Sequence, residues 1–212
     1  MTRGERLVAE FAGTSFLLAA IVGSGIMAEN LSGGSVGLAL LANAIATAGV
    51  LYALIAAFGP VSGAHFNPLV SLAMVWRGDL PKADLAPYIA VQIAGAVLGV
   101  VIAHLMFGLP PLMEGIKPRT GASQFLAEIV ASGGLLMIVL RVSAANAPAA
   151  VACYIAGAYW FTASTSFANP AVTLARALTD SFAGIRPADV PAFVAAQLIG
   201  LGIAYFALRR AR

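Results

Sequence analysis

Apolar residues fill most of the chain in long stretches, and short polar segments separate these stretches. About 20 helical residues are needed to cross the roughly 30 Å hydrocarbon core of a bilayer. Six stretches reach that scale, and they cover residues 6–28, 36–57, 83–107, 124–143, 147–164 and 188–208. The pattern therefore predicts an all-α membrane protein with six transmembrane helices.

Two further apolar segments, residues 67–76 and 169–178, are too short to cross a bilayer. Ten helical residues cover about 15 Å, which is half of the hydrocarbon core. Each segment is therefore expected to enter the membrane and return on the same side, as a re-entrant half-helix. Irregular backbone at that depth is tolerated only where protein buries it or where it lines a wet cavity. Two such segments indicate a polar path through the molecule.

Composition supports a membrane protein, because 60% of the 212 residues are hydrophobic and only 10% are charged. Soluble domains carry about 25% charged residues. The first stretch is too long for a signal-peptide core, so we expect no cleavage. The net charge of +3 does not indicate a nucleic-acid partner, because Lys and Arg lie mainly at the ends of the stretches. The single Cys153 excludes an internal disulfide and is expected to be a small packing residue.

The positions of the basic residues predict the orientation of the chain. An even number of spans puts both termini on one side, and cytoplasmic segments carry an excess of Lys and Arg. With the N-terminus inside, the inner set has eight members: Arg3, Arg6, Arg77, Lys82, Arg141, Arg209, Arg210 and Arg212. The outer set has four: Lys117, Arg119, Arg176 and Arg186. Both termini are therefore expected in the cytoplasm.

The two short segments open on the same dipeptide, Asn67-Pro68 in one and Asn169-Pro170 in the other. The similarity extends to the flanks, and it pairs residues 62–73 with 164–175, Glu10 with Glu128, and Gln92 with Gln197. The chain is thus one domain, 1–212, made of repeats at about 1–110 and 120–212. Three spans in each repeat give the halves opposite orientations, and such inverted repeats place a site near the midplane.

The Asn-Pro dipeptides are well suited to start a helix inside a bilayer. Asn is a favoured N-cap, and Pro at the first helical position loses no N–H that the helix needs. Each helix N-terminus carries about +0.5 of an elementary charge. Two such ends that meet at the midplane form a positive electrostatic barrier.

This duplicated motif resembles the Asn-Pro-Ala signature of the aquaporin and aquaglyceroporin (major intrinsic protein) family, and the resemblance covers nearly the full chain. It implies a passive pore in which Asn67 and Asn169 donate hydrogen bonds to the permeant, while carbonyl groups of 63–66 and 165–168 accept them. It also implies a homotetramer with one pore in each protomer. Ala171 follows the family pattern, whereas Leu69 replaces the usual Ala and adds bulk either beside the constriction or in its packing.

The largest departure from the family pattern is Val172, because most members carry Arg directly after the second Asn-Pro-Ala. The other three constriction positions, transferred by their offsets from the motifs, fall on Thr47, Gly157 and Ser166. All four side chains are small and uncharged, so the resemblance implies a wide and mildly polar constriction. Pore size and the donors that line it set selectivity. This filter favours polyols, metalloid hydroxides, urea or ammonia over water alone.

Residues 165–180 resemble a bacterial branch of the family that is associated with arsenic resistance and has Val in place of the filter Arg. The resemblance implies transport of arsenite as neutral arsenous acid across the bacterial inner membrane. The alternatives are a facilitator for water and glycerol or for urea and ammonia. A proton-coupled secondary transporter also uses inverted repeats and broken helices, but this short chain leaves little room for a rocking domain. The sequence contains no arrangement typical of an enzyme, a metal site or a cofactor site.

Four other polar residues have more than one interpretation. Arg176 lies four residues after Val172 on the same helix face; it either lines the outer vestibule, or extends to the interface or pairs with Asp180. The resemblance implies that Glu10 and Glu128 brace the re-entrant loops through backbone N–H groups, and proton coupling is the alternative. His65 is expected to be a hydrogen-bonded loop residue, with a pH-sensitive gate as the alternative.

Overall fold

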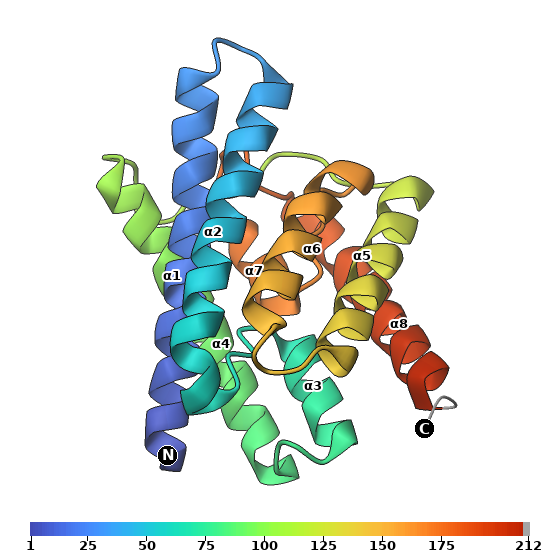
Figure 1. The fold of residues 1–212 in the computed structure, drawn as a ribbon. Helices are drawn as coiled ribbons and strands as arrows, with labels where there is room; N and C mark the ends of the chain where they lie inside the picture. Colours follow the sequence, from blue (N-terminus) through green and yellow to red (C-terminus); the bar gives the residue numbers. More distant parts are fainter. Residues whose placement is uncertain (210–212) are drawn as a thin grey trace.

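The computed structural model describes residues 1–209, which form a bundle of helices (Figure 1). Long helices surround two short ones, and a 3-10 turn, Pro187–Asp189, precedes the last helix. In chain order the α-helices are α1 (Arg3–Leu31), α2 (Val36–Ser62), α3 (Pro68–Arg77), α4 (Lys82–Met106), α5 (Ala122–Arg141), α6 (Ala147–Phe161), α7 (Pro170–Arg176) and α8 (Val190–Arg209).

Five of the six predicted spans appear as helical segments long and apolar enough to cross a membrane: α1, α2, α4, α5 and the segment Pro187–Leu208. The sixth prediction, 147–164, is too long, because α6 has 15 residues and ends at Phe161. The chain turns into an extended conformation at Thr162, whose hydroxyl donates to the carbonyl of Ala158 at 2.7 Å. Fifteen residues cover only about 22 Å, so the segment after α6 begins at membrane depth.

The two short helices begin where the sequence predicts, with Asn67 and Asn169 as N-caps and Pro at the first helical position. Helix α3 ends before Gly78, whose φ of 91° gives a left-handed C-cap that favours glycine. Helix α7 ends at Arg176, two residues before the predicted end of its segment, because the chain turns there and leads into the loop before α8. Figure 1 shows both short helices among the long ones.

The packing follows the repeat that the sequence predicts. Helix α1 packs mainly on α4 and α2 in the first half, while α5 packs mainly on α8 and α6 in the second. Equivalent glycines make the two main contacts possible, because Gly95 of α4 lies against the backbone of Phe11 and Gly200 of α8 lies against the backbone of Ile129. A Cβ at either glycine would overlap that backbone, so small residues permit the close approach.

The start of α1 and the end of α8 lie at the same end of the bundle (Figure 1). We call the opposite end the outer end. There, residues 107–121 connect α4 to α5 and run beside the segment that follows α7: Gly115 N–H donates to the Ala177 carbonyl at 2.9 Å, and Arg186 N–H donates to the Lys117 carbonyl at 2.9 Å. The shared end of α1 and α8 agrees with an even number of spans.

Candidate functional site

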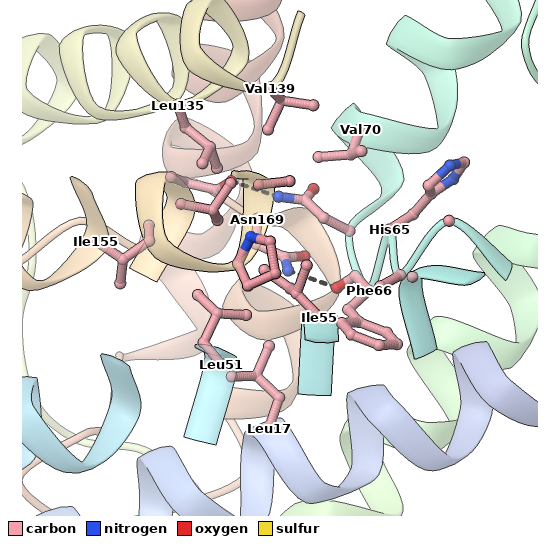
Figure 2. Close-up of a pocket in the computed structure, with 18 of the residues that line it drawn as sticks. Leu17, Leu51, Ile55, His65, Phe66, Val70, Leu135, Val139, Ile155 and Asn169 are labelled. Atoms are coloured by element: carbon pink, nitrogen blue, oxygen red, sulfur yellow. Dashed lines mark hydrogen bonds between the residues drawn. The ribbon is translucent and has the colours of Figure 1, made fainter. Parts of the chain in front are cut away.

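The two Asn-Pro motifs meet head to head inside the bundle. Each Asn side-chain oxygen accepts from its own helix, with Leu69 N–H at 2.9 Å from Asn67 and Ala171 N–H at 3.0 Å from Asn169. Each amide nitrogen donates across the repeat: Asn67 Nδ2 to the Ala168 carbonyl and Asn169 Nδ2 to the Phe66 carbonyl, both at 2.8 Å (Figure 2). Because an amide nitrogen has two hydrogens, each Asn keeps one further donor.

The backbone before each motif is strained. The φ angles are 49° at Ala64 and 47° at Phe66 in the first half, and 61°, 52° and 47° at Thr165, Ser166 and Ala168 in the second. Non-glycine residues in this left-handed region cost on the order of 1–3 kcal/mol each and persist only where surrounding contacts fix them. The loops therefore depend on groups that hold their N–H donors.

Two buried carboxylates hold these loops. Glu10 accepts from the N–H groups of His65 and Phe66 at 2.9 and 2.7 Å. Glu128 accepts from the N–H groups of Phe167 and Ala168, both at 2.9 Å. Both side chains are fully buried, and in membrane interiors every such backbone group needs a partner.

Each carboxylate also belongs to a side-chain network, and the two networks match. Gln92 Nε2 donates to Glu10 at 2.8 Å and to the Ser71 hydroxyl at 2.9 Å. Gln197 Nε2 donates to Glu128 at 2.6 Å and to the hydroxyl of Thr173 at 2.8 Å. The sequence analysis did not identify Ser71 and Thr173, although the two residues occupy equivalent positions in the repeated segments 62–73 and 164–175. His65 joins the first network, because its Nδ1 lies 3.1 Å from Ser71 Oγ.

A cavity of about 880 Å³ passes both Asn residues. Asn67, Asn169 and the loop residues before them form its polar side. Its other side is mainly aliphatic, and Figure 2 shows these side chains gathered around Asn169: Leu17, Leu51, Ile55, Leu135, Val139 and Ile155. One polar and one apolar side suit small solutes that carry several hydroxyl groups but no charge.

The residues of the two motifs are buried, but they do not all face this cavity. Leu69 is outside the lining and packs in an apolar cluster with Val70, Ala73 and Tyr88. Its extra bulk is therefore in the packing of α3, which answers the question that the sequence left open. Pro68, Pro170 and Ala171 are also buried and are not among the lining residues.

The predicted constriction is only partly brought together at the outer part of the cavity. Thr47, Ser166 and Val172 line the cavity and are buried. Gly157 does not line it: the residue is exposed, and no atom lies within 4 Å of the position that a Cβ would take. The assignment of Gly157 to the constriction is therefore wrong in this structure.

Helical periodicity explains the correction. The buried face of α6 carries Val151, Ile155 and Tyr159, four residues apart, and all three line the cavity. Gly157 is two residues from Ile155, which is about 200° around an α-helix, so it lies on the opposite face. Cys153 shares that exposed face, so the expectation of a small packing residue is not met within residues 1–209.

Arg176 lies in the cavity wall and is only 2% exposed. Its guanidinium carbon is 3.4 Å from the centre of the Phe167 ring, a cation–π contact, and its Nε donates to the carbonyl of Ala183. The salt bridges of residues 1–209 do not include a pair with Asp180, which is exposed. The outer part of the cavity therefore contains a buried positive charge and the aromatic ring of Tyr159, rather than small uncharged side chains alone.

Comparison with known proteins agrees with this architecture. Residues 2–158 match the sequence profile described as "Major intrinsic protein". The chain belongs to the major intrinsic protein family. It is 53% identical over 199 residues to Aquaglyceroporin AqpS of Rhizobium meliloti, covering 92% of this chain and 85% of that one. It is 32% identical over 160 residues to Aquaporin Z of Brucella melitensis, covering 70% and 69%.

Among solved structures, the aquaglyceroporin from Plasmodium falciparum superposes with a TM-score of 0.69 over 96% of this chain and 94% of that chain. The identity is 19%, so this likeness supports the fold alone. Together the comparisons confirm both the family and the aquaporin-like fold that the sequence predicts. This major intrinsic protein is thus a multi-pass membrane channel for small solutes.

Removing the charge of Arg176 should weaken the exclusion of cations from this channel. We expect Arg176→Ala to raise the proton leak about tenfold, which corresponds to ~1.4 kcal/mol of barrier. Arg176→Lys keeps the charge and should change the leak much less. The measurement is the decay of an imposed pH gradient in proteoliposomes, at low and high salt. An unchanged leak and unchanged solute flux in Arg176→Ala would show that the guanidinium has no part in the vestibule.

Proposed function

We propose that this channel conducts small uncharged hydroxylated solutes passively and that its principal solute is arsenite, as arsenous acid. The observation that carries the proposal is Val172, an apolar residue in the cavity wall at the position where most of the family has Arg. A neutral side chain there leaves room for a compact solute with three hydroxyl groups. Thr47 and Ser166 support this proposal, because they also line the cavity and their side chains are small and uncharged.

The cavity offers such a solute both kinds of hydrogen bond. The second amide hydrogens of Asn67 and Asn169 can donate to its oxygens, while the loop carbonyls before each motif accept from its hydroxyl groups. The aliphatic side chains opposite need no polar partner. A small polyol can therefore exchange water for these groups without an unsatisfied donor. A cation would lose its hydration beside the two Asn residues without a negative charge in return.

The hydrogen bonds of the two buried carboxylates favour a channel over a proton-coupled transporter. Glu10 accepts four hydrogen bonds, from Ser62, His65, Phe66 and Gln92, and Glu128 accepts three. These donors come from the re-entrant segments and from the two buried glutamines, so they occupy the carboxylate oxygens. The two carboxylates brace the loops and are poor candidates for a proton carrier.

The exposed surface of the protomer bears on its oligomeric state and on its location in a membrane. Exposed apolar side chains along the long helices, such as Phe16, Ile45 and Trp160, need lipid or protein around them. We propose a homotetramer in the bacterial inner membrane, with both termini in the cytoplasm and one pore in each protomer.

Permeability measurements on Val172→Arg test the proposal. The substitution adds bulk and a second guanidinium one helical turn from Arg176. We expect the permeability to arsenous acid and glycerol to fall at least about tenfold and water permeability to change much less. Val172→Met is the matched control, because it adds bulk without charge and should have an intermediate effect.

The measurement is stopped-flow light scattering of proteoliposomes with arsenous acid, glycerol, urea and water. Flux of arsenous acid should be proportional to its gradient and unaffected by an imposed proton gradient. Arsenous acid permeability no higher than that of protein-free vesicles would reject the proposed solute. Accumulation against the gradient would instead support coupled transport.

A further inference from the structure

We infer that Tyr159 is the residue that sets the size limit of the outer constriction, in place of the glycine that family offsets select. The inference rests on the proposed channel function and deepens it. It assigns a specificity-determining role to an aromatic side chain on α6, which the sequence did not indicate.

The inference starts from the orientation of α6. Tyr159 is 3% exposed and continues the cavity-lining row of Val151 and Ile155 by one turn toward the end of the helix. It is the largest side chain of this row. Gly157 lies on the opposite, exposed face and contributes nothing to the passage.

A long hydrogen bond joins the phenol ring of Tyr159 to α2. The Tyr159 hydroxyl donates to Thr47 Oγ1 at 3.3 Å, and this bond links α6 to α2. Both residues are buried and line the cavity. Ser166 and Val172 contribute to the same lining from the second re-entrant segment. The constriction therefore combines this ring with three small side chains and with Arg176, whose guanidinium lies against the Phe167 ring. The Tyr159 ring then decides how much width remains.

The hydroxyl gives Tyr159 a second property. A distance of 3.3 Å is long for an O–H···O hydrogen bond, which is usually 2.5–3.0 Å. A hydroxyl of a passing solute can replace this weak bond and pair with Tyr159 and Thr47 in turn. The ring then limits the size of the solute, while the hydroxyl forms a hydrogen bond that replaces one the solute made to water. A compact triol passes, and a longer polyol meets the ring.

A series of polyols of increasing length tests the role of the ring. Permeability to glycerol, erythritol and xylitol is measured in proteoliposomes that contain Tyr159→Ala, Tyr159→Phe or the unaltered channel. Tyr159→Ala should raise xylitol permeability about tenfold while the glycerol value changes less, and Tyr159→Phe should leave the ratio of the two within about twofold. An unchanged ratio in Tyr159→Ala would overturn the inference.

Cysteine accessibility provides a test that does not depend on the effect of lost packing. In a Cys153→Ser background, Tyr159→Cys and Gly157→Cys are treated with a membrane-impermeant thiol reagent. Glycerol flux should be blocked in Tyr159→Cys and should persist in Gly157→Cys, because only the first position faces the passage. The reverse result would show that Gly157 lines the constriction and that the assignment to Tyr159 is wrong.

These outcomes are separate from the question of the natural solute. If arsenous acid does not permeate but the polyol limit moves with Tyr159, the proposed solute is rejected and the role of Tyr159 stands. If arsenous acid permeates and the limit does not depend on Tyr159, the proposed function stands and the inference fails.

Discussion

Glu128→Ala should destabilise the second Asn-Pro loop so strongly that the channel no longer conducts. The carboxylate is fully buried and accepts hydrogen bonds from the N–H groups of Phe167 and Ala168 and from Gln197 Nε2. Alanine leaves all three donors without an acceptor, at about 1–3 kcal/mol each. The total is comparable with the whole stability of a typical protein, about 5–15 kcal/mol. The left-handed backbone at Ser166 and Ala168 would then lose the contacts that hold it.

The control for this prediction is Glu128→Gln, which keeps one acceptor oxygen and nearly the same shape. It should lie between the unaltered channel and Glu128→Ala, because its amide nitrogen meets donors instead of acceptors. The measurements are the unfolding temperature in detergent, the elution profile, and glycerol flux after reconstitution. Glu10→Ala should be at least as harmful, since Glu10 has four donors. A monodisperse Glu128→Ala protein with normal flux would refute the bracing role.

The centre of the site could be predicted from the sequence because its signals are local. Asn67 and Asn169 combine a helix cap, a following Pro and an apolar segment of half-membrane length, and the structure brings both to one cavity. Their exchange of hydrogen bonds with Ala168 and Phe66 joins residues more than 100 positions apart. Only the symmetry of the repeat pointed to that contact.

The error at Gly157 has a different origin. Gly157 was selected by its distance in sequence from Asn169. This distance predicts a pore-facing residue only if α6 is rotated about its axis as in the rest of the family. A helix of 15 residues that ends at Phe161 fixes its own rotation through the face that it buries. Apolar residues cover both faces of α6, including the exposed Trp160 and Phe161, so hydrophobic periodicity gives no signal for this rotation. The buried row that ends at Tyr159 is apparent only in the structure.

The environment of Arg176 was only half predictable. Its place on the same helix face as Val172 follows from their spacing, and both line the cavity. Its contacts with Phe167 and with the Ala183 carbonyl involve irregular loop backbone on either side of α7. Hydrophobic periodicity does not describe such loops, so these partners had no signal in the sequence.

Arg119 shows the same limit, and it leads to a second large expected effect. The sequence identified it only as an outer basic residue, but it is a buried cation that holds the second re-entrant loop from outside. Its Nε donates to the Gly184 carbonyl at 2.9 Å and its Nη1 to the Ser164 carbonyl at 3.1 Å. Its guanidinium carbon lies 4.8 Å from the centre of the Phe167 ring. Burial lowers the pKa of Arg119 to about 10, so the side chain stays charged at neutral pH.

We therefore expect Arg119→Met to loosen the loop that carries Ser164 and Ser166 while leaving the apolar packing nearly filled. Hydrogen bonds to a charged group contribute about 1.5–3 kcal/mol. In a chain of this length each kcal/mol corresponds to roughly 2–4 °C of unfolding temperature. The unfolding temperature should fall by several degrees, and glycerol permeability should fall with it, because Ser166 and the loop carbonyls lose their fixed positions in the cavity wall.

The matched control is Arg186→Gln, which removes another outer arginine. Arg186 is about half-exposed, and its Nη2 donates to the buried carboxylate of Asp189 at 2.9 Å. Gln removes the charge and can still donate a hydrogen bond to this carboxylate. Both substitutions remove one positive charge from the outer end, so a general electrostatic effect on permeation would appear in both. A loss confined to Arg119→Met assigns the effect to the loop contacts. Equal unfolding temperatures and equal glycerol permeabilities in the two variants would show that the second loop is held by Glu128 alone.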